Sequence, residues 1–300
     1  EAKTMLTSEL MNKIRHIELK TRHLVNDSFA GEYHSVFKGR GMTFDEVRQY
    51  QYGDEIRTID WNVTARMGDA YVKRFVEERE LTVMLAVDVS ASGDFGTVNR
   101  FKRELAAELA AVLSFAATTN NDRVGLLIFS DEIELLIPPR KGRKHVLRII
   151  RELLAFEPKD SGTDLNVAID TLSRILKRRS IVFLVSDFIT DLESHRVQLR
   201  RLNKQHDIVA IDLHDPMERT VAKTGVLLLE DAETGELVWV DTNSDTWQAQ
   251  FMKDSEEFEL AKKSVFNATG IDRIYVNTAE DYLDALTLFF KKRSRQARRV

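Results

Sequence analysis

The sequence predicts an α/β fold in which a doubly wound, mostly parallel sheet is covered by helices on both faces. From Thr82 onward, short apolar runs rich in Val, Ile and Leu alternate with longer amphipathic stretches. Strand–helix–strand repetition with short connections is typical of parallel sheets. Runs such as Thr82–Val87 lack polar alternation, as expected of strands that are buried on both faces.

Each element can be placed by its pattern. The expected strands are Thr82–Asp88, Arg123–Phe129, Glu132–Ile137, Ser180–Ser186, Asp207–Leu213 and Asp272–Val276. The expected helices are Arg100–Thr118, Lys144–Phe156, Leu165–Lys177, Leu192–Asn203, Thr246–Ala268 and Ala279–Lys292. Pro158 ends the second of these helices, because the position before a proline is disfavoured in a helix. A tight turn at Ser130 and Asp131 should pair Glu132–Ile137 with the strand before it.

The chain is expected to divide near residue 80. Residues 80–300 form the α/β domain, into which a β-hairpin is inserted at about 224–242, because two short apolar runs flank the turn sequence Asp231–Gly235. Residues 1–79 form an N-terminal extension with an amphipathic helix at Thr7–Val25. Gly31–Arg79 is dense in Gly, Arg and Asp, so we expect it to pack on the α/β domain. Its side chains Asp54, Arg57, Asp60 and Arg66 are equally suited to an interaction patch and to an ion-pair network.

Composition excludes several classes of protein. The 300 residues include no cysteine, which excludes disulfides, thiolate metal sites and a cysteine nucleophile. No apolar run is long enough to cross a bilayer, and the first residues do not resemble a signal peptide, so a cytoplasmic location without a transmembrane segment is expected. The net charge of −4 gives no general attraction to nucleic acid. The basic segment Lys291–Arg299 is interpreted as a solvated helix end, with docking to an acidic partner or lipid as the alternative.

The residues that carry chemistry stand where predicted strands end. Asp88-Val89-Ser90-Ala91-Ser92 follows the first strand, Thr163 precedes a helix, and Asp187 follows the strand Ser180–Ser186. Ligands of open α/β sheets bind outside the carboxyl ends of the strands. Carboxylate and hydroxyl oxygens suit a hard cation such as Mg²⁺. The competing interpretation is a loop in which Asp and Ser cap backbone N–H groups. The common placement of these residues at one sheet edge favours the metal.

This set resembles the metal-ion-dependent adhesion site of von Willebrand factor A domains, in which Asp-x-Ser-x-Ser is followed by a distant Thr and a distant Asp. The resemblance implies that Ser90, Ser92 and Thr163 contact the metal directly. It also implies that Asp88 and Asp187 act mainly through bound water. Because neutral hydroxyls leave the cation poorly neutralised, it can accept a carboxylate from a partner protein.

A wider resemblance covers nearly the whole chain. The segments that carry it are Gly39–Gly41, Phe44–Arg48, Tyr52–Asp54, Arg57–Trp61, Ala65-Arg66, Phe75–Glu80, Asp122–Gly125, Ser186–Phe188, Asp215-Pro216 with Glu218, and Glu233–Gly235. Together they resemble the domain of unknown function 58 family, bacterial and archaeal proteins often encoded beside MoxR-type AAA+ ATPases. Gly93-Asp94 departs from the family, in which a Met more often follows the second Ser of the motif.

These features predict an interaction module and not an enzyme. We expect it to bind Mg²⁺, or Mn²⁺, and through the metal an acidic side chain of a protein partner. The resemblance implies a MoxR-type AAA+ ATPase as that partner, with a role in assembly or maturation of a target protein. The chain has no GxxxxGK[ST] motif, so ATP hydrolysis must come from the partner. The alternative is a metal-assisted hydrolase that uses the same site, although the motif places no His or Glu beside it as a general base. A nucleic-acid-binding protein ranks third, because the basic C-terminal segment alone supports it.

Overall fold

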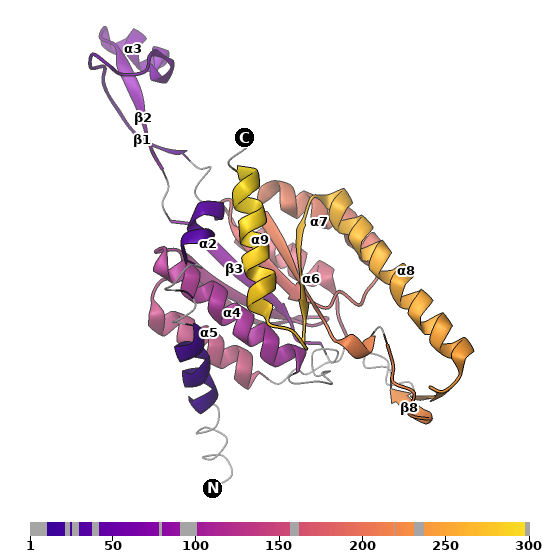
Figure 1. Cartoon of the computed structure of the whole chain (residues 1–300). Helices are drawn as coiled ribbons and strands as arrows, with labels where there is room; N and C mark the ends of the chain where they lie inside the picture. The colour runs from indigo at the N-terminus through magenta and orange to yellow at the C-terminus, as the bar shows by residue number, and fades with distance from the viewer. Residues whose placement is uncertain are drawn as a thin grey trace. The chain divides into compact units, whose positions relative to one another are not determined.

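The computed structural model describes residues 11–21, 25, 30–37, 42–77, 80–90, 101–156, 162–218, 220–230 and 237–297. The chain forms two compact units. Residues Glu1–Val36 and Thr82–Val300 make up the larger unit, which we call the body, and Phe37–Leu81 make up the small unit. Figure 1 shows the elements of both units.

The body contains a six-stranded sheet in the order β10-β7-β6-β3-β4-β5. Its parallel strands are β3 (Thr82–Asp88), β4 (Arg123–Phe129), β6 (Ile181–Ser186), β7 (Asp207–His214) and β10 (Asp272–Asn277). The edge strand β5 (Ile133–Arg140) is antiparallel to β4. In chain order β3 is the first strand of this sheet, and it lies between β6 and β4 in the middle. The later strands therefore add on both sides of it. The predicted fold class is thereby confirmed.

Helices cover both faces of this sheet. They are α4 (Lys102–Thr119), α5 (Arg143–Ala155), α6 (Leu165–Ile175), α7 (Leu192–Gln205), α8 (Asp245–Thr269) and α9 (Tyr282–Ala297). Met84 and Ala86 of β3 share a core cluster with residues of α6, α7 and α8. Because side chains alternate along a strand, Val83, Leu85 and Val87 point to the opposite face, and all three are buried. This burial on both faces explains the uninterrupted apolar runs of the sequence.

The N-terminal helices belong to the body. The helix over residues 11–21 places Ile14 and Ile17 against Ala111, Val146 and Ile150. The next helix, α2 (Ala30–Phe37), places the hydroxyl of Tyr33 at 3.1 Å from Oδ2 of the buried Asp122, to which it donates. These contacts fasten the start of the chain to α4 and α5.

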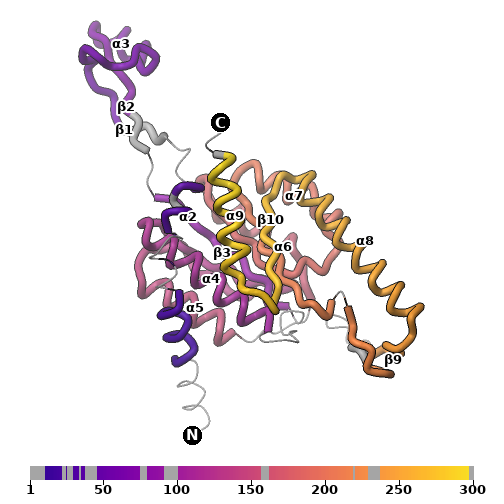
Figure 2. Tube along the Cα trace, viewed as in Figure 1, coloured from indigo at the N-terminus to yellow at the C-terminus, as the bar shows by residue number. Residues whose placement is uncertain are grey.

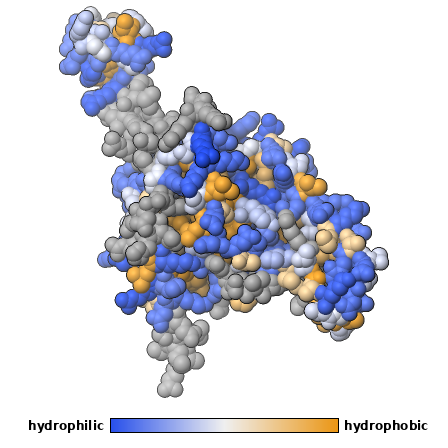
Figure 3. Space-filling model, viewed as in Figure 1, coloured by the Kyte–Doolittle hydropathy of each residue, from blue (hydrophilic) through white to orange (hydrophobic). Residues whose placement is uncertain are grey.

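The predicted hairpin is formed by β8 (Val226–Glu230) and β9 (Leu237–Asp241), which pair antiparallel. It lies beside the first turn of α8 at one end of the body (Figure 2). The Gln248 side chain of α8 donates to the carbonyl oxygens of Val221 and Thr242, and these bonds hold the base of the hairpin. Polar side chains cover much of the visible face of the molecule, and apolar ones occur in scattered patches (Figure 3). No described helix is long and apolar enough to cross a membrane.

The small unit consists of the antiparallel pair β1 (Met42–Gln49) and β2 (Tyr71–Glu77), the short helix η2 (Ile56–Thr58) and α3 (Trp61–Met67). Asp60 caps α3 by accepting from the N–H groups of Asn62 and Val63, and Gly68 ends it at a φ of 84°. Arg48 donates to both carboxylate oxygens of Asp54, at 2.6 and 2.9 Å. Asp54 and Asp60 therefore stabilise the unit itself.

Candidate metal site

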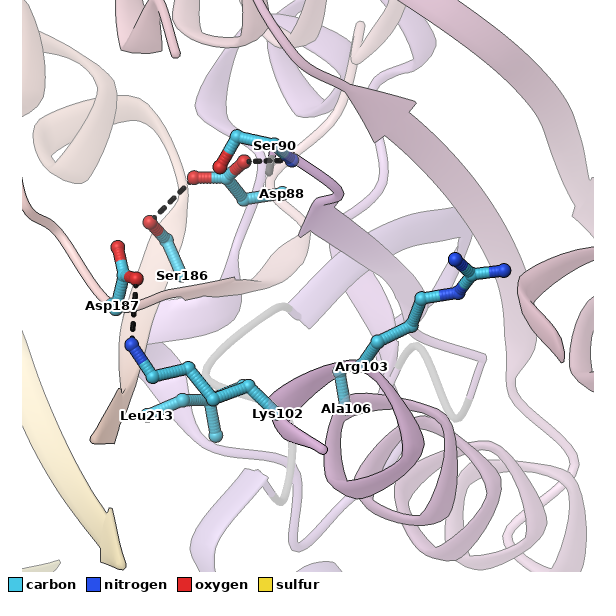
Figure 4. A pocket seen from close by; sticks show the side chains of 8 residues that line it. All are labelled: Asp88, Ser90, Lys102, Arg103, Ala106, Ser186, Asp187 and Leu213. Atoms are coloured by element: carbon cyan, nitrogen blue, oxygen red, sulfur yellow. Dashed lines mark hydrogen bonds and ion pairs between the residues drawn. The ribbon is translucent and has the colours of Figure 1, made fainter. Parts of the chain in front are cut away.

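The candidate site lies at the carboxyl end of the two central strands. β3 and β6 run in parallel with Val87 opposite Val185, so Asp88 and Ser186 end their strands side by side. The Ser186 hydroxyl donates to Oδ2 of Asp88 at 2.7 Å, and the N–H of Ser90 donates to Oδ1 at 3.0 Å (Figure 4). Both oxygens of the Asp88 carboxylate are therefore held by hydrogen bonds from neighbouring groups of the site.

Asp187 is positioned by an unusual backbone turn. Phe188 has a φ of 53°, in the left-handed region that residues other than glycine rarely adopt. Its fully buried ring packs edge-on against Phe266, with ring centroids 5.2 Å apart, and its N–H donates to the Ser186 hydroxyl at 2.9 Å. The Ile189 N–H donates to Oδ1 of Asp187 at 3.2 Å. Burial of Phe188 holds this strained turn and directs Asp187 toward Asp88.

A buried lysine enters the site from α4. Lys102 is the first residue of that helix, and its side chain is 2% exposed. The ammonium nitrogen lies 2.8 Å from Oδ2 of Asp187 and forms a second ion pair with Glu218. In Figure 4 the Lys102 side chain extends toward Asp187, while the neighbouring Arg103 points away from the carboxylates. Arg103 donates instead to the carbonyl oxygen of Phe156.

Glu218 is held in place by the turn that follows β7. Asp215 precedes the short helix η4 (Pro216–Glu218) and accepts from the N–H of Met217 at 3.0 Å and the hydroxyl of Thr278 at 2.7 Å. The Asp215 N–H in turn donates to Oε2 of Glu218 at 3.1 Å. One oxygen of Glu218 thus bonds the turn, and the other faces Lys102.

The electrostatics of the site are dominated by burial of its carboxylates. Burial raises the pKa of Asp88 to about 6, and the charge of Asp187 raises it as well, against the lowering effect of the bonds from Ser90 and Ser186. Burial also raises the pKa of Glu218, and Lys102 offsets only part of that. Burial works against the charged form of Lys102, but Asp187 and Glu218 outweigh it and hold its pKa above the usual value. Lys102 is therefore an ammonium.

A neighbouring cluster of charges provides a contrast. Asp212 of β7 is completely buried among Lys262, Glu259 and Arg273. In this cluster two carboxylates face two cations. At the candidate site, Lys102 pairs with Asp187 and Glu218, and Lys262 of the neighbouring cluster donates to the Asp187 carbonyl oxygen at 3.0 Å. Because Lys262 is already paired with Asp212 and Glu259, the described carboxylates Asp88, Asp187 and Glu218 leave two negative charges uncompensated when all are ionised.

The structure brings together part of the predicted ligand set. Asp88, Ser90 and Asp187 line one pocket with Ser186 and Lys102. Thr163 does not line this pocket. It lies in the loop before α6, where the Asp164 N–H donates to the carbonyl oxygen of Ser130 just beyond β4. Ser92 and the Gly93-Asp94 departure fall outside the described residues.

Sequence reasoning missed Lys102, Glu218 and the hydroxyl of Ser186. A signal existed for Lys102, because it stands three residues before Leu105 and seven before Leu109 on the buried face of an Ala-rich helix. A lysine at such a position needs a buried partner. Glu218 was recognised as part of a family pattern, but its spacing gave no indication that it reaches the sheet edge.

The chain matches the family described as "Protein of unknown function DUF58" over residues 46–259. The chain belongs to this family. An uncharacterised protein of Mycobacterium tuberculosis strain H37Rv is 31% identical over 291 residues, which cover 96% of this chain and 91% of the relative. An uncharacterised protein of Mycobacterium bovis matches to the same extent.

Solved structures that resemble this DUF58 protein include one that supports its fold. An aerotolerance-related membrane protein from Bacteroides fragilis is similar with a TM-score of 0.50 at 16% identity, over 72% of this chain and 99% of the other. The SpRpn10 VWA domain is similar with a TM-score of 0.40 at 13% identity, over 69% of this chain and 93% of the other. The DUF58 body thus has the α/β fold with a mostly parallel sheet that the sequence predicts.

The residues present fit a hard cation. Asp88, Ser90 and Asp187 offer carboxylate and hydroxyl oxygens, the ligand types that Mg²⁺ and Mn²⁺ prefer. No group of three or more His, Cys, Asp or Glu side chains suited to a metal occurs in the described part of the chain. A cation would therefore depend on hydroxyls and water in addition to the two aspartates, and the excess negative charge would favour its entry.

Proposed function

We propose that this protein is an interaction module that binds Mg²⁺, or Mn²⁺, at Asp88, Ser90 and Asp187. The observation that carries the proposal is the charge of the site: Lys102 pairs with Asp187 and Glu218, and the buried Asp88 lies close enough to Asp187 to feel its charge. Among the described residues, these three carboxylates and one ammonium leave two negative charges uncompensated, which is costly unless a cation joins them. One divalent ion has the charge required.

The bound ion would supply an open, electrophilic coordination position. Asp88 and Asp187 would orient its water ligands, and the Ser90 hydroxyl would coordinate it. The family resemblance adds Ser92 and Thr163 as further ligands. A carboxylate from a partner protein fits the remaining position, because oxygen anions are the preferred ligands of such ions.

The partner we propose is a MoxR-type AAA+ ATPase, and the proposed role is in assembly or maturation of a target protein. The proposal of this partner rests on membership of the DUF58 family and on the resemblance noted above. The chain has no phosphate-binding GxxxxGK[ST] sequence. The nucleotide would therefore be bound and hydrolysed by the partner.

A pull-down with the purified ATPase from the same genome tests this function. We expect immobilised wild-type protein to retain the ATPase in Mg²⁺ but not in EDTA, and Asp88→Asn to abolish retention. Retention that is equal in Mg²⁺ and EDTA would contradict the metal dependence. Lack of retention under both conditions would contradict the partner.

A metal-assisted hydrolase is the second candidate, and Glu218 is the observation that favours it. The motif alone placed no Glu beside the ligands, but the fold does. Both oxygens of Glu218 are already bonded, one to Lys102 and one to the Asp215 N–H, which makes it a poor general base. We expect no metal-dependent turnover of generic phosphate or carboxylate esters. Turnover that disappears in Thr163→Ala would reverse this ranking.

A further inference from the structure

Lys102 stands where a lysine does not help its helix. It is the first residue of α4, at the positive end of the helix dipole, where a cation is unfavourable. Its side chain is also almost completely buried, at a further cost in desolvation. Asp187, at 2.8 Å, and Glu218 are described ion-pair partners that offset these costs. The position of Lys102 is thus explained by the site and not by the helix.

We infer that Lys102 is the built-in counter-ion of the metal site, which lowers its affinity for divalent cations and sets the charge that the loaded site presents to a partner. This inference rests on the proposed metal binding. The Lys102 ammonium forms an ion pair with Oδ2 of Asp187, and the Ile189 N–H donates to Oδ1. Asp187 is therefore held in one orientation and is partly neutralised before any ion arrives.

Lys102 affects which partner can bind, because it changes the net charge of the metal-loaded site. With Lys102 present, the two uncompensated charges are cancelled by one divalent ion, and a partner carboxylate meets a neutral site. Without Lys102, the same loaded site retains one negative charge, which repels a carboxylate. Lys102 thus weakens the binding of the metal and permits the binding of an acidic partner.

A charge series measured with Mn²⁺ alone tests the inference. The titrations are run by calorimetry at pH 8, with the full chain. Lys102→Met adds one uncompensated negative charge to the site, and Glu218→Gln removes one. We expect Mn²⁺ affinity to rise by about tenfold or more in the first variant and to fall by about tenfold in the second, since a unit charge acts on the ion over a few ångströms of low-dielectric interior. The double variant Lys102→Met with Glu218→Gln restores the wild-type charge and should bind Mn²⁺ with nearly wild-type affinity.

An ion pair at the opposite end of the sheet supplies the control. Arg293→Met with Asp207→Asn removes a partly buried ion pair at the start of β7, and neither residue lines the pocket. We expect it to lower the melting temperature without changing Mn²⁺ affinity. The melting temperature of Lys102→Met should be lower than that of the wild type in EDTA and should recover with Mn²⁺. If Lys102→Met does not fold, Glu218→Gln and the double variant still test the order of affinities.

The outcomes separate this inference from the proposed function. If the wild type binds Mn²⁺ and Lys102→Met binds it equally or more weakly, Lys102 is not a counter-ion and the inference is overturned, while the metal site stands. If Lys102→Met binds Mn²⁺ and the wild type does not, the ammonium takes the place of the metal, which overturns the proposed function and with it the role of Lys102 in a loaded site. If neither the wild type nor any variant binds Mn²⁺, both are overturned.

Discussion

The ammonium of Lys102 lies 2.8 Å from Oδ2 of Asp187, and both side chains are almost completely buried. The contact joins the start of α4 to the end of β6, two segments that are far apart in the sequence. Buried ion pairs contribute little net stability, because desolvation of the two charges offsets their attraction. Removal of one partner is costly all the same, since it leaves the other charge buried and unpaired. The pair therefore affects the chemistry of the sheet edge more than the stability of the fold.

The first prediction concerns the assignment of Asp88. Asp88→Asn preserves the shape of the side chain but removes its charge and one anionic oxygen, so we expect Mn²⁺ affinity to fall by about tenfold or more. Asp122→Asn is the control, because Asp122 is a buried aspartate just before β4, at the opposite end of the strands, where it accepts from the Tyr33 hydroxyl. It should lose stability and keep its Mn²⁺ affinity. Equal affinity of Asp88→Asn and wild-type protein in calorimetry would remove Asp88 from the site.

The second prediction concerns the pH dependence of stability in the metal-free protein. The pKa of Asp88 is about 6 in the folded chain and about 3.9 in an unfolded one. Between these values the folded state retains a proton that the unfolded state releases. The free energy of unfolding therefore falls as pH rises from about 4 to about 6, and the loss of roughly 2–3 kcal/mol persists above pH 6. Below pH 4 the contribution vanishes.

Urea unfolding of wild type and Asp88→Asn in EDTA isolates this contribution. The two proteins should be equally stable near pH 4, and the variant should be more stable near pH 8 by about 2 kcal/mol. Mn²⁺ should reverse the order at pH 8, because it stabilises the protein that binds it. A stability difference that does not change with pH would show that Asp88 is ionised normally in the fold.

The third prediction concerns Gly125, which belongs to the segment Asp122–Gly125. A Cβ atom there would lie 2.9 Å from Sδ of Met84 and 3.0 Å from both the Ile137 carbonyl oxygen and Cγ of Pro139. Backbone and proline atoms cannot easily move, so Gly125→Ala should cost about 1–3 kcal/mol of unfolding free energy. Gly31→Ala is the control, since a Cβ atom at Gly31, in α2, would have no neighbour within 4 Å. It should raise stability by roughly 0.5–1 kcal/mol. Equal melting temperatures for the two variants would contradict the packing argument.

The fold could be predicted from the sequence because its signals are local and strong. The runs Thr82–Asp88 and Ser180–Ser186 match β3 and β6 almost residue for residue, since strands buried on both faces must be continuously apolar. Element ends were less certain. The helix expected at Leu165–Lys177 ends at Ile175, two residues earlier. The order of the strands in space cannot be predicted from the hydrophobic pattern alone. It requires the general rules of α/β topology.

The residues that line the pocket were predicted only in part, and the reason is physical. Asp88, Ser90 and Asp187 follow strands, so their common sheet edge can be inferred from topology. Lys102 and Glu218 reach the site from a helix start and a turn, and only tertiary packing determines that they meet. Thr163 lies in a loop whose Asp164 N–H donates to the Ser130 carbonyl oxygen just beyond β4, and it does not line the pocket.

The last prediction concerns the small unit, Phe37–Leu81, whose packing on the body remains an expectation from its composition. Trp61 is 67% exposed in the structure of the chain. An indole exposed to water makes no apolar contact, and its burial by docking would contribute on the order of 2 kcal/mol to the free energy of unfolding. If the unit docks on the body or on a partner, the fluorescence emission of Trp61 should lie at shorter wavelength than that of an indole in water. The emission of Trp61 is obtained as the difference between the spectra of the wild type and Trp61→Phe.

Limited proteolysis distinguishes a docked unit from a loose one. A docked unit should resist cleavage between Gly39 and Gly68, and replacement of residues 38–80 by a short Gly-Ser linker should lower the melting temperature of the body. The replacement leaves the N-terminal helix in place, whose Ile14 and Ile17 pack in the body core. Rapid cleavage that leaves a body of unchanged melting temperature would instead make Phe37–Leu81 an arm that is free to engage a partner. Protection that appears only when Mg²⁺ and the ATPase are both added would then identify the ATPase as that partner.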